Sequence, residues 1–176
     1  RYEEANNLLK YSFWFSESDL FWYIPVFISE KNYEEVDKII REIDGEERME
    51  YDLEDFMLRN GAIFNYTAAE YYFKHKNDTE EALRRLEKGI ETEERMIRID
   101  LEFMEMIKRR RLGVEEVTEL HMKNPNDPDL QLGHRGLDWH AGRKIYFLPI
   151  SELYRLKSEI LESIGRKAEA EEAKKK

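Results

Sequence analysis

The sequence contains no cysteine, and this absence removes several kinds of chemistry. Disulfide bonds, thiolate nucleophiles and zinc sites with cysteine ligands are all excluded. A chain without cysteine fits a reducing compartment, and we expect a cytoplasmic protein. There is also no uninterrupted apolar run of about 18 or more residues, so the sequence predicts no membrane-spanning helix. The window richest in apolar residues, 11–28, is broken by the polar stretch 16–19.

Positive charge is in deficit. The chain has 29 lysine and arginine residues against 39 aspartate and glutamate residues, which gives a net charge of −10. An acidic chain repels phosphate backbones at long range, so binding to nucleic acid or to an anionic membrane is disfavoured. Hydrophobic residues make up 41% of the sequence, which is enough for a core, and charged residues make up 39%. Such an excess of charge also occurs in thermophile proteins and in computationally redesigned ones.

Signals for β-strands are scarce as well. The two turn-like dipeptides, Asp44-Gly45 and Asn60-Gly61, follow or separate helical patterns, and the second marks a kink or a short turn. Three segments instead carry apolar residues at the spacing of one helix face. These residues are Val36, Ile39, Ile40 and Ile43; Ala82, Leu83, Leu86 and Ile90; and Leu153, Leu156, Ile160 and Ile164.

Boundary residues support these helices. Gly45 and Gly165 follow the first and third stripes, where a glycine commonly ends a helix. Asp78 or Thr79 is the expected N-cap of the second helix, with Glu80 and Glu81 in its first turn. The sequence therefore predicts an all-α fold.

Three stretches repeat one order of features, in which a helix with aromatic residues leads through a short polar turn into a second amphipathic helix. They begin at Leu20, Tyr66 and Tyr154. This pattern resembles the tetratricopeptide repeat (TPR), a helix-turn-helix unit of about 34 residues. The matching positions are Leu20, Tyr23, Phe27, Val36, Ile40 and Ile43; Tyr66, Ala69, Phe73, Ala82, Leu86 and Gly89; and Tyr154, Ser158, Leu161, Gly165 and Ala170. The resemblance implies antiparallel helix hairpins stacked as a short α-solenoid, with these residues in the core.

The spacing departs from a regular array. Val36, Ala82 and Ala170, which occupy equivalent positions, lie farther apart than about 34 residues, so we expect additional helical sequence near residues 46–62 and 92–123. We expect one helical-repeat domain over residues 1–176. Because the chain begins at Arg1 and its first methionine is Met49, we also expect a fragment or a processed form.

A long loop is expected at residues 124–142, after Pro125 and Pro128. Its His134, Asp138 and His140 are residue types that bind metals, although their spacing matches no known signature. Arg135 and His140 are similar to the Arg-x-x-x-x-His motif of the HEPN ribonucleases, which would act on a scissile phosphate. The third alternative is an ordered loop in which Trp139 packs into the helices or contacts a partner.

Two further clusters have both a structural and a binding interpretation. The aromatic residues within 13–23 exceed what one helix face can bury, so they serve the core or an interface. The basic run 108–111 ends a predicted helix, where cations favour the helix dipole; it could also bind an acidic peptide or a phosphate.

The sequence thus favours a non-catalytic scaffold that binds a peptide or helix of a partner protein on its concave face, without a cofactor. The expected contact residues are Tyr72, Lys74, Arg85 and, from the loop, Trp139. One alternative is a helical enzyme or metal-binding domain centred on His134, Asp138 and His140. The other is a structural or engineered helical array without a natural ligand.

Overall fold

The structure is a computed structural model that describes residues 23–45, 50–124, 126–127 and 148–176. The secondary structure of these residues is helical, with no strand among them, so the all-α prediction is confirmed. The elements are α2 (Ile24–Ser29), α3 (Tyr33–Asp44), α4 (Glu50–Tyr71), the π-helical segment η2 (Tyr72–Lys76), α5 (Thr79–Arg110), α6 (Val114–Lys123), α8 (Ile150–Ser163) and α9 (Lys167–Ala173).

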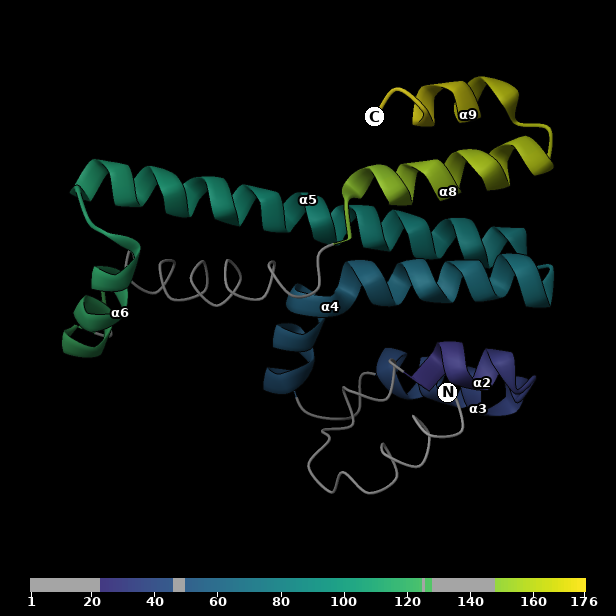
Figure 1. The fold of residues 1–176 in the computed structure, drawn as a ribbon, viewed down its shortest axis with the longest axis horizontal. Coiled ribbons are helices and arrows are strands. Elements are labelled where there is room, and N and C mark those ends of the chain that lie inside the picture. Colours follow the sequence, from purple (N-terminus) through teal and green to yellow (C-terminus); the bar gives the residue numbers. More distant parts are fainter. Residues whose placement is uncertain (1–22, 46–49, 125, 128–147) are drawn as a thin grey trace.

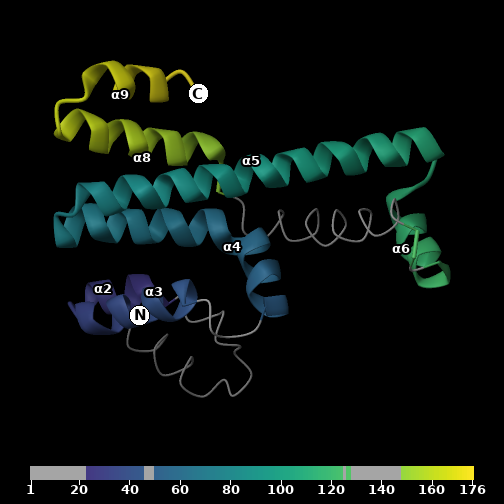
Figure 2. The same cartoon turned by 180° about the vertical axis from the view of Figure 1, so that it is seen from behind.

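The helices form hairpins that lie beside one another. Figure 1 shows α4 and α5 running antiparallel, followed by α8 and α9, with α2 and α3 next to α4; Figure 2 shows the same order from behind. One apolar core joins α4, α5, α8 and α9, and a second joins α2 and α3 to α4. Each of these hairpins therefore buries an apolar face against the hairpin that lies beside it.

The first hairpin follows its predicted pattern. Asn32 caps α3 by accepting a hydrogen bond from the backbone N–H of Glu35. The side chains of Val36, Ile39, Ile40 and Ile43 are buried, as predicted. Gly45 lies just past the end of α3, as predicted, but with φ −70° it is extended and does not use the left-handed conformation open to glycine.

The second hairpin confirms one expected boundary and corrects another. Asp78 is the N-cap of α5, and its side chain accepts a hydrogen bond of 3.0 Å from the backbone N–H of Glu81. Helix α4 continues through Asn60-Gly61, so of the two predicted alternatives, a kink or a short turn, the turn is wrong. Figure 1 shows that α4 is bent, and a hydrogen bond of 2.8 Å joins the Asn65 side-chain amide to the carbonyl of Gly61.

At the centre of the second hairpin, close packing of the helices requires a residue without a side chain, Gly89. A Cβ atom on Gly89 would lie 3.0 Å from Leu153 Cδ2, 3.3 Å from Asn65 Cβ and 3.4 Å from the carbonyl oxygen of Ala62. Helices α4 and α8 thus both approach α5 at Gly89. This close contact agrees with the packing role predicted for Gly89.

The third hairpin is formed by α8 and α9. Leu153, Leu156 and Ile160 are buried as predicted, but Ile164 is 42% exposed, so its assignment to the same face is wrong. The reason is that α8 ends at Ser163, and Ile164 no longer follows the helix register. Gly165 has φ +80° and turns the chain, which allows the Arg166 N–H to donate to the Leu161 carbonyl at 2.9 Å.

Helix α5 is much longer than its partners. Its C-terminal half extends past the ends of α4 and α8 (Figure 1) and packs on α6 through Phe103, Met106 and Val117. The helical sequence predicted within 92–123 is therefore present. The basic run begins with the last turn of α5, and Arg111 caps the helix in the left-handed conformation. Arg110 pairs with Asp127 at 3.0 Å.

Candidate functional site

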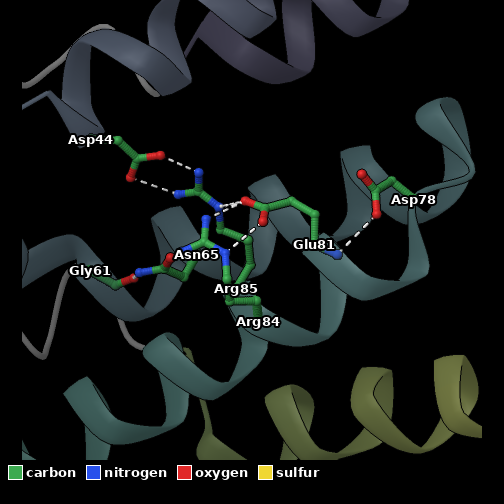
Figure 3. Close-up of polar contacts among 7 residues, drawn as sticks. All are labelled: Asp44, Gly61, Asn65, Asp78, Glu81, Arg84 and Arg85. Carbon is green, nitrogen blue, oxygen red and sulfur yellow. Dashed lines mark hydrogen bonds and ion pairs between the residues drawn. The ribbon is translucent and has the colours of Figure 1, made fainter.

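An ionic cluster around the buried side chain of Arg85 joins the first hairpin to the second. It consists of Asp44 at the end of α3 and Glu81, Arg84 and Arg85 in the first turns of α5, and Figure 3 shows the carboxylates converging on the two guanidinium groups. We call it the Arg85 cluster. Arg85 donates from Nη1 to Asp44 Oδ1 at 2.8 Å and from Nη2 to Asp44 Oδ2. Its Nε donates to Glu81 Oε1 at 2.8 Å.

Burial is uneven within this cluster. The Arg85 side chain is 2% exposed, whereas those of Asp44 and Glu81 are 33% and 21% exposed. Burial lowers the pKa of Arg85, but the hydrogen bonds and charges of Asp44 and Glu81 outweigh it and raise this pKa overall. Burial alone would raise the pKa of Glu81, and the hydrogen bonds from Arg84 and Arg85 reverse this, so the pKa is lowered. Glu81 and Arg85 therefore remain charged near neutral pH.

Aromatic rings complete the surroundings of Arg85. Its guanidinium carbon lies 5.8 Å from the ring centroid of Phe64 and 5.8 Å from that of Tyr72. A guanidinium between rings and carboxylates is desolvated but well paired, which fixes its position. Since Asp44 belongs to α3 and Arg85 to α5, the cluster sets how the first hairpin lies against the second.

A second contact between these hairpins involves Tyr71. Its hydroxyl donates to Asp37 Oδ1 at 2.8 Å, and the carbonyl oxygen of Tyr33 lies 3.2 Å from the same hydroxyl. Burial, followed by the hydrogen bond to Asp37, raises the pKa of Tyr71 to about 12. Lys76 also reaches Asp37 at 2.7 Å, and the His75 ring packs against Tyr33 at a centroid distance of 5.5 Å. The π-helical segment η2 is thus held against α3.

The accessible candidate site lies where side chains of α4 and η2 meet those of α8. We call it the α4/α8 surface, and its residues are Tyr66, Glu70, Lys74, Glu152, Arg155 and Glu159. Arg155 Nη2 donates to the Tyr66 hydroxyl at 3.2 Å, and its Nε donates to Glu152 at 2.8 Å. Lys74 donates to Glu70 at 2.6 Å. Tyr66 is half-buried, whereas Lys74 and Arg155 are exposed.

Charges of both signs surround the Tyr66 hydroxyl. Burial and then the charge of Glu70 raise the pKa of Tyr66, while Arg155 opposes this shift. The hydrogen bond to Glu70 raises the pKa of Lys74, and the hydrogen bond to Glu152 raises that of Arg155. An aromatic ring with exposed ion pairs around it offers an apolar contact together with donors and acceptors, the chemistry with which protein surfaces bind peptides.

The structure places the predicted contact residues in different surroundings. Lys74 is exposed on the α4/α8 surface, and Tyr72 is half-buried, with its ring 5.4 Å from that of Tyr71. Arg85 is buried, so its expected position on an open face is wrong. Trp139 lies outside the described residues.

The residues of the predicted metal site, His134, Asp138 and His140, also lie outside the described residues, as does Arg135. Within the described part of the chain, no group of three or more histidine, aspartate or glutamate side chains could hold a metal ion. No helix in that part is long and apolar enough to cross a membrane.

Comparisons with known proteins identify no relative. No protein-family model matches the chain, and neither a curated protein nor a solved structure matches it significantly. The site is therefore interpreted from its own geometry.

Several site residues were not predicted from the sequence, among them Asp44, Glu81, Tyr66 and Arg155 as polar partners. For Glu81 a local signal exists, because it lies one helical turn before Arg85. Asp44 lies 41 residues from Arg85, and Tyr66 lies 89 residues from Arg155, so no local spacing connects these pairs.

Proposed function

We propose that this chain is a non-catalytic scaffold whose hairpins form a short TPR-like α-solenoid and bind a peptide segment of a partner protein on the α4/α8 surface. The observation that carries this proposal is the meeting of Tyr66 and Arg155 at 3.2 Å. It joins the first helices of two hairpins into one accessible patch of aromatic and charged groups. Stacked helix hairpins commonly bind peptides on such extended surfaces.

The chemistry of the surface suggests what the partner contributes. Arg155 lies near Glu152 and Glu159, at 2.8 Å and 3.7 Å, and Lys74 lies beside Glu70. A peptide carboxylate could replace an intramolecular acceptor of Arg155 or Lys74, and an apolar side chain could cover the Tyr66 ring. We therefore propose a peptide with an acidic residue next to an apolar one. The alternative function, a metal site formed by His134, Asp138 and His140, stays a prediction.

The test is selection from a display library of random peptides, followed by affinity measurements on purified peptides. We expect selected peptides to combine an acidic residue with an aromatic or aliphatic one. Arg155→Glu should weaken their binding at least about tenfold, because one attractive contact becomes repulsive. Tyr66→Phe, which keeps the ring and loses only the hydroxyl, should bind within about threefold of the original chain.

Lys88→Glu is the matched control, because Lys88 is an exposed cation on α5 and its reversal changes the net charge equally. Binding to this variant should stay close to that of the original chain. If no peptide is selected, or if Arg155→Glu and Lys88→Glu weaken binding equally, the α4/α8 surface is not the binding site. Circular dichroism of each variant checks that helix content is unchanged.

A further inference from the structure

The C-terminal half of α5 carries an apolar stripe on its exposed side, although its other side packs on α6. Leu101 is 61% exposed and Met104 is 47% exposed. Phe103 and Met106, on the other side, are buried. A helix with apolar residues on two sides usually has two partners, and among the helices that the structure describes α6 packs on one of these sides.

The spacing of this stripe is that of a coiled-coil seam. Ile97, Leu101, Met104 and Lys108 follow one another at alternating intervals of four and three residues. This order of intervals is the same in both directions along the helix. A second copy of α5 that runs antiparallel would therefore place its Met104 against Leu101 and its Leu101 against Met104. The lysine would contribute its aliphatic stem at the ends of the seam.

Charge complementarity favours the same partner. Arg98 and Glu105, both exposed, flank the seam on one side, one turn from its centre in opposite directions. In the antiparallel arrangement Arg98 of one copy faces Glu105 of the other, and the pair occurs twice. Neither residue forms an ion pair with another described residue.

We propose that two copies of this chain associate through an antiparallel pairing of the C-terminal halves of α5. This segment extends beyond α4 and α8 (Figures 1 and 2), and its Leu101 and Met104 side chains are exposed. The seam is short and the net charge of −10 opposes association, so the dimer is weak. We expect a dissociation constant on the order of ten to a hundred micromolar.

Charge reversal tests the pairing in sedimentation velocity experiments at about 0.15 M salt, where long-range repulsion is screened. Arg98→Glu or Glu105→Arg places like charges at both contacts, so each variant alone should dimerise at least about tenfold more weakly. An equimolar mixture of the two variants has opposite charges at both contacts and should form a heterodimer about as stable as the original dimer. The double variant should dimerise again by itself.

Lys88→Glu, outside the seam, should leave the dimer unchanged, and Leu101→Ser/Met104→Ser should abolish it without loss of helix content. The proposal is overturned if the original chain sediments as a monomer at every accessible concentration, since the stripe would then serve another partner. It is equally overturned if the mixed variants remain monomeric, or if the chain dimerises and the seam variants have no effect.

Discussion

Removing Asp44 from the Arg85 cluster should destabilise the fold more than removing Arg85 itself. Asp44→Ala leaves Arg85, which is 2% exposed, with Glu81 as its remaining acidic partner in the cluster. Breaking a buried ion pair by deleting one partner costs about 3–5 kcal/mol. Because Glu81 still compensates part of the charge, we expect a loss of about 3 kcal/mol in the free energy of unfolding, the lower end of this range.

Arg85→Met should have a smaller effect, because it removes the buried charge and keeps most of the volume. The carboxylates it leaves are partly exposed to water, and Glu81 keeps its contact with Arg84. Replacing a buried charged group by an apolar one of similar size is often nearly neutral, and methionine retains favourable contacts with Phe64 and Tyr72. We expect a loss of less than about 1 kcal/mol.

The decisive variant is Asp44→Ala/Arg85→Met, whose stability should lie within about 0.5 kcal/mol of that of Arg85→Met alone. Urea unfolding followed by far-ultraviolet circular dichroism gives the free energy of unfolding of the original chain, of the two single variants and of the double variant. Arg84→Met is the control for loss of an exposed arginine and should change stability by less than about 0.5 kcal/mol. If Arg85→Met were as destabilising as Asp44→Ala, or if the double variant were no more stable than Asp44→Ala, the uncompensated charge would not be the cause.

Three further effects follow from single contacts. Gly89→Ala should lose about 1 kcal/mol although alanine favours helix, because its Cβ meets Leu153 at 3.0 Å, and urea unfolding in a Leu153→Ala background should show a smaller loss. Since the folded-state pKa of Tyr71 is raised to about 12, its contribution to stability is complete below about pH 10 and is lost as the pH rises toward 12. Unfolding measured across that range should be less dependent on pH in Tyr71→Phe, and an equal dependence would contradict the argument. Asp78→Ala should cost about 1 kcal/mol in urea unfolding through loss of the helix cap, and an equal effect of Thr79→Ala would assign the cap wrongly.

The sequence predicted the helices well because apolar periodicity records burial directly. The stripe from Val36 to Ile43 is buried as predicted, and Gly89 is where the helix backbones approach. The residue types at the helix ends predicted the exact helix boundaries less well. Both Asp78 and Thr79 are suitable caps, and only the geometry selects Asp78. Ile164 fits the periodic pattern, but α8 ends one residue before it, at Ser163. Ile164 already belongs to the turn that contains Gly165, so its side chain does not follow the helix face.

The polar part of the site could be predicted only in part. Lys74 was expected to be accessible, and it is exposed. Arg85 was expected to be accessible because it alternates with packing residues, but a helix does not alternate. It lies three residues after Ala82 and four before Gly89, which places it on the packed face. Because arginine is charged, the sequence offered no reason to expect Arg85 in the core. The residue that compensates its buried charge, Asp44, is distant in the sequence, so no local pattern predicts the pair.

The two proposed interaction surfaces lie on different parts of the molecule, and this separation has a consequence for function. The α4/α8 surface involves the hairpin region, whereas the self-association seam lies on the part of α5 that extends beyond it (Figure 1). A dimer would therefore carry two peptide sites without blocking either. Two linked sites bind a partner with two matching segments more tightly than one site does, because the second contact forms within the complex. Arg98→Glu should then weaken binding of a two-segment peptide but not of a single segment, whereas Arg155→Glu should weaken both.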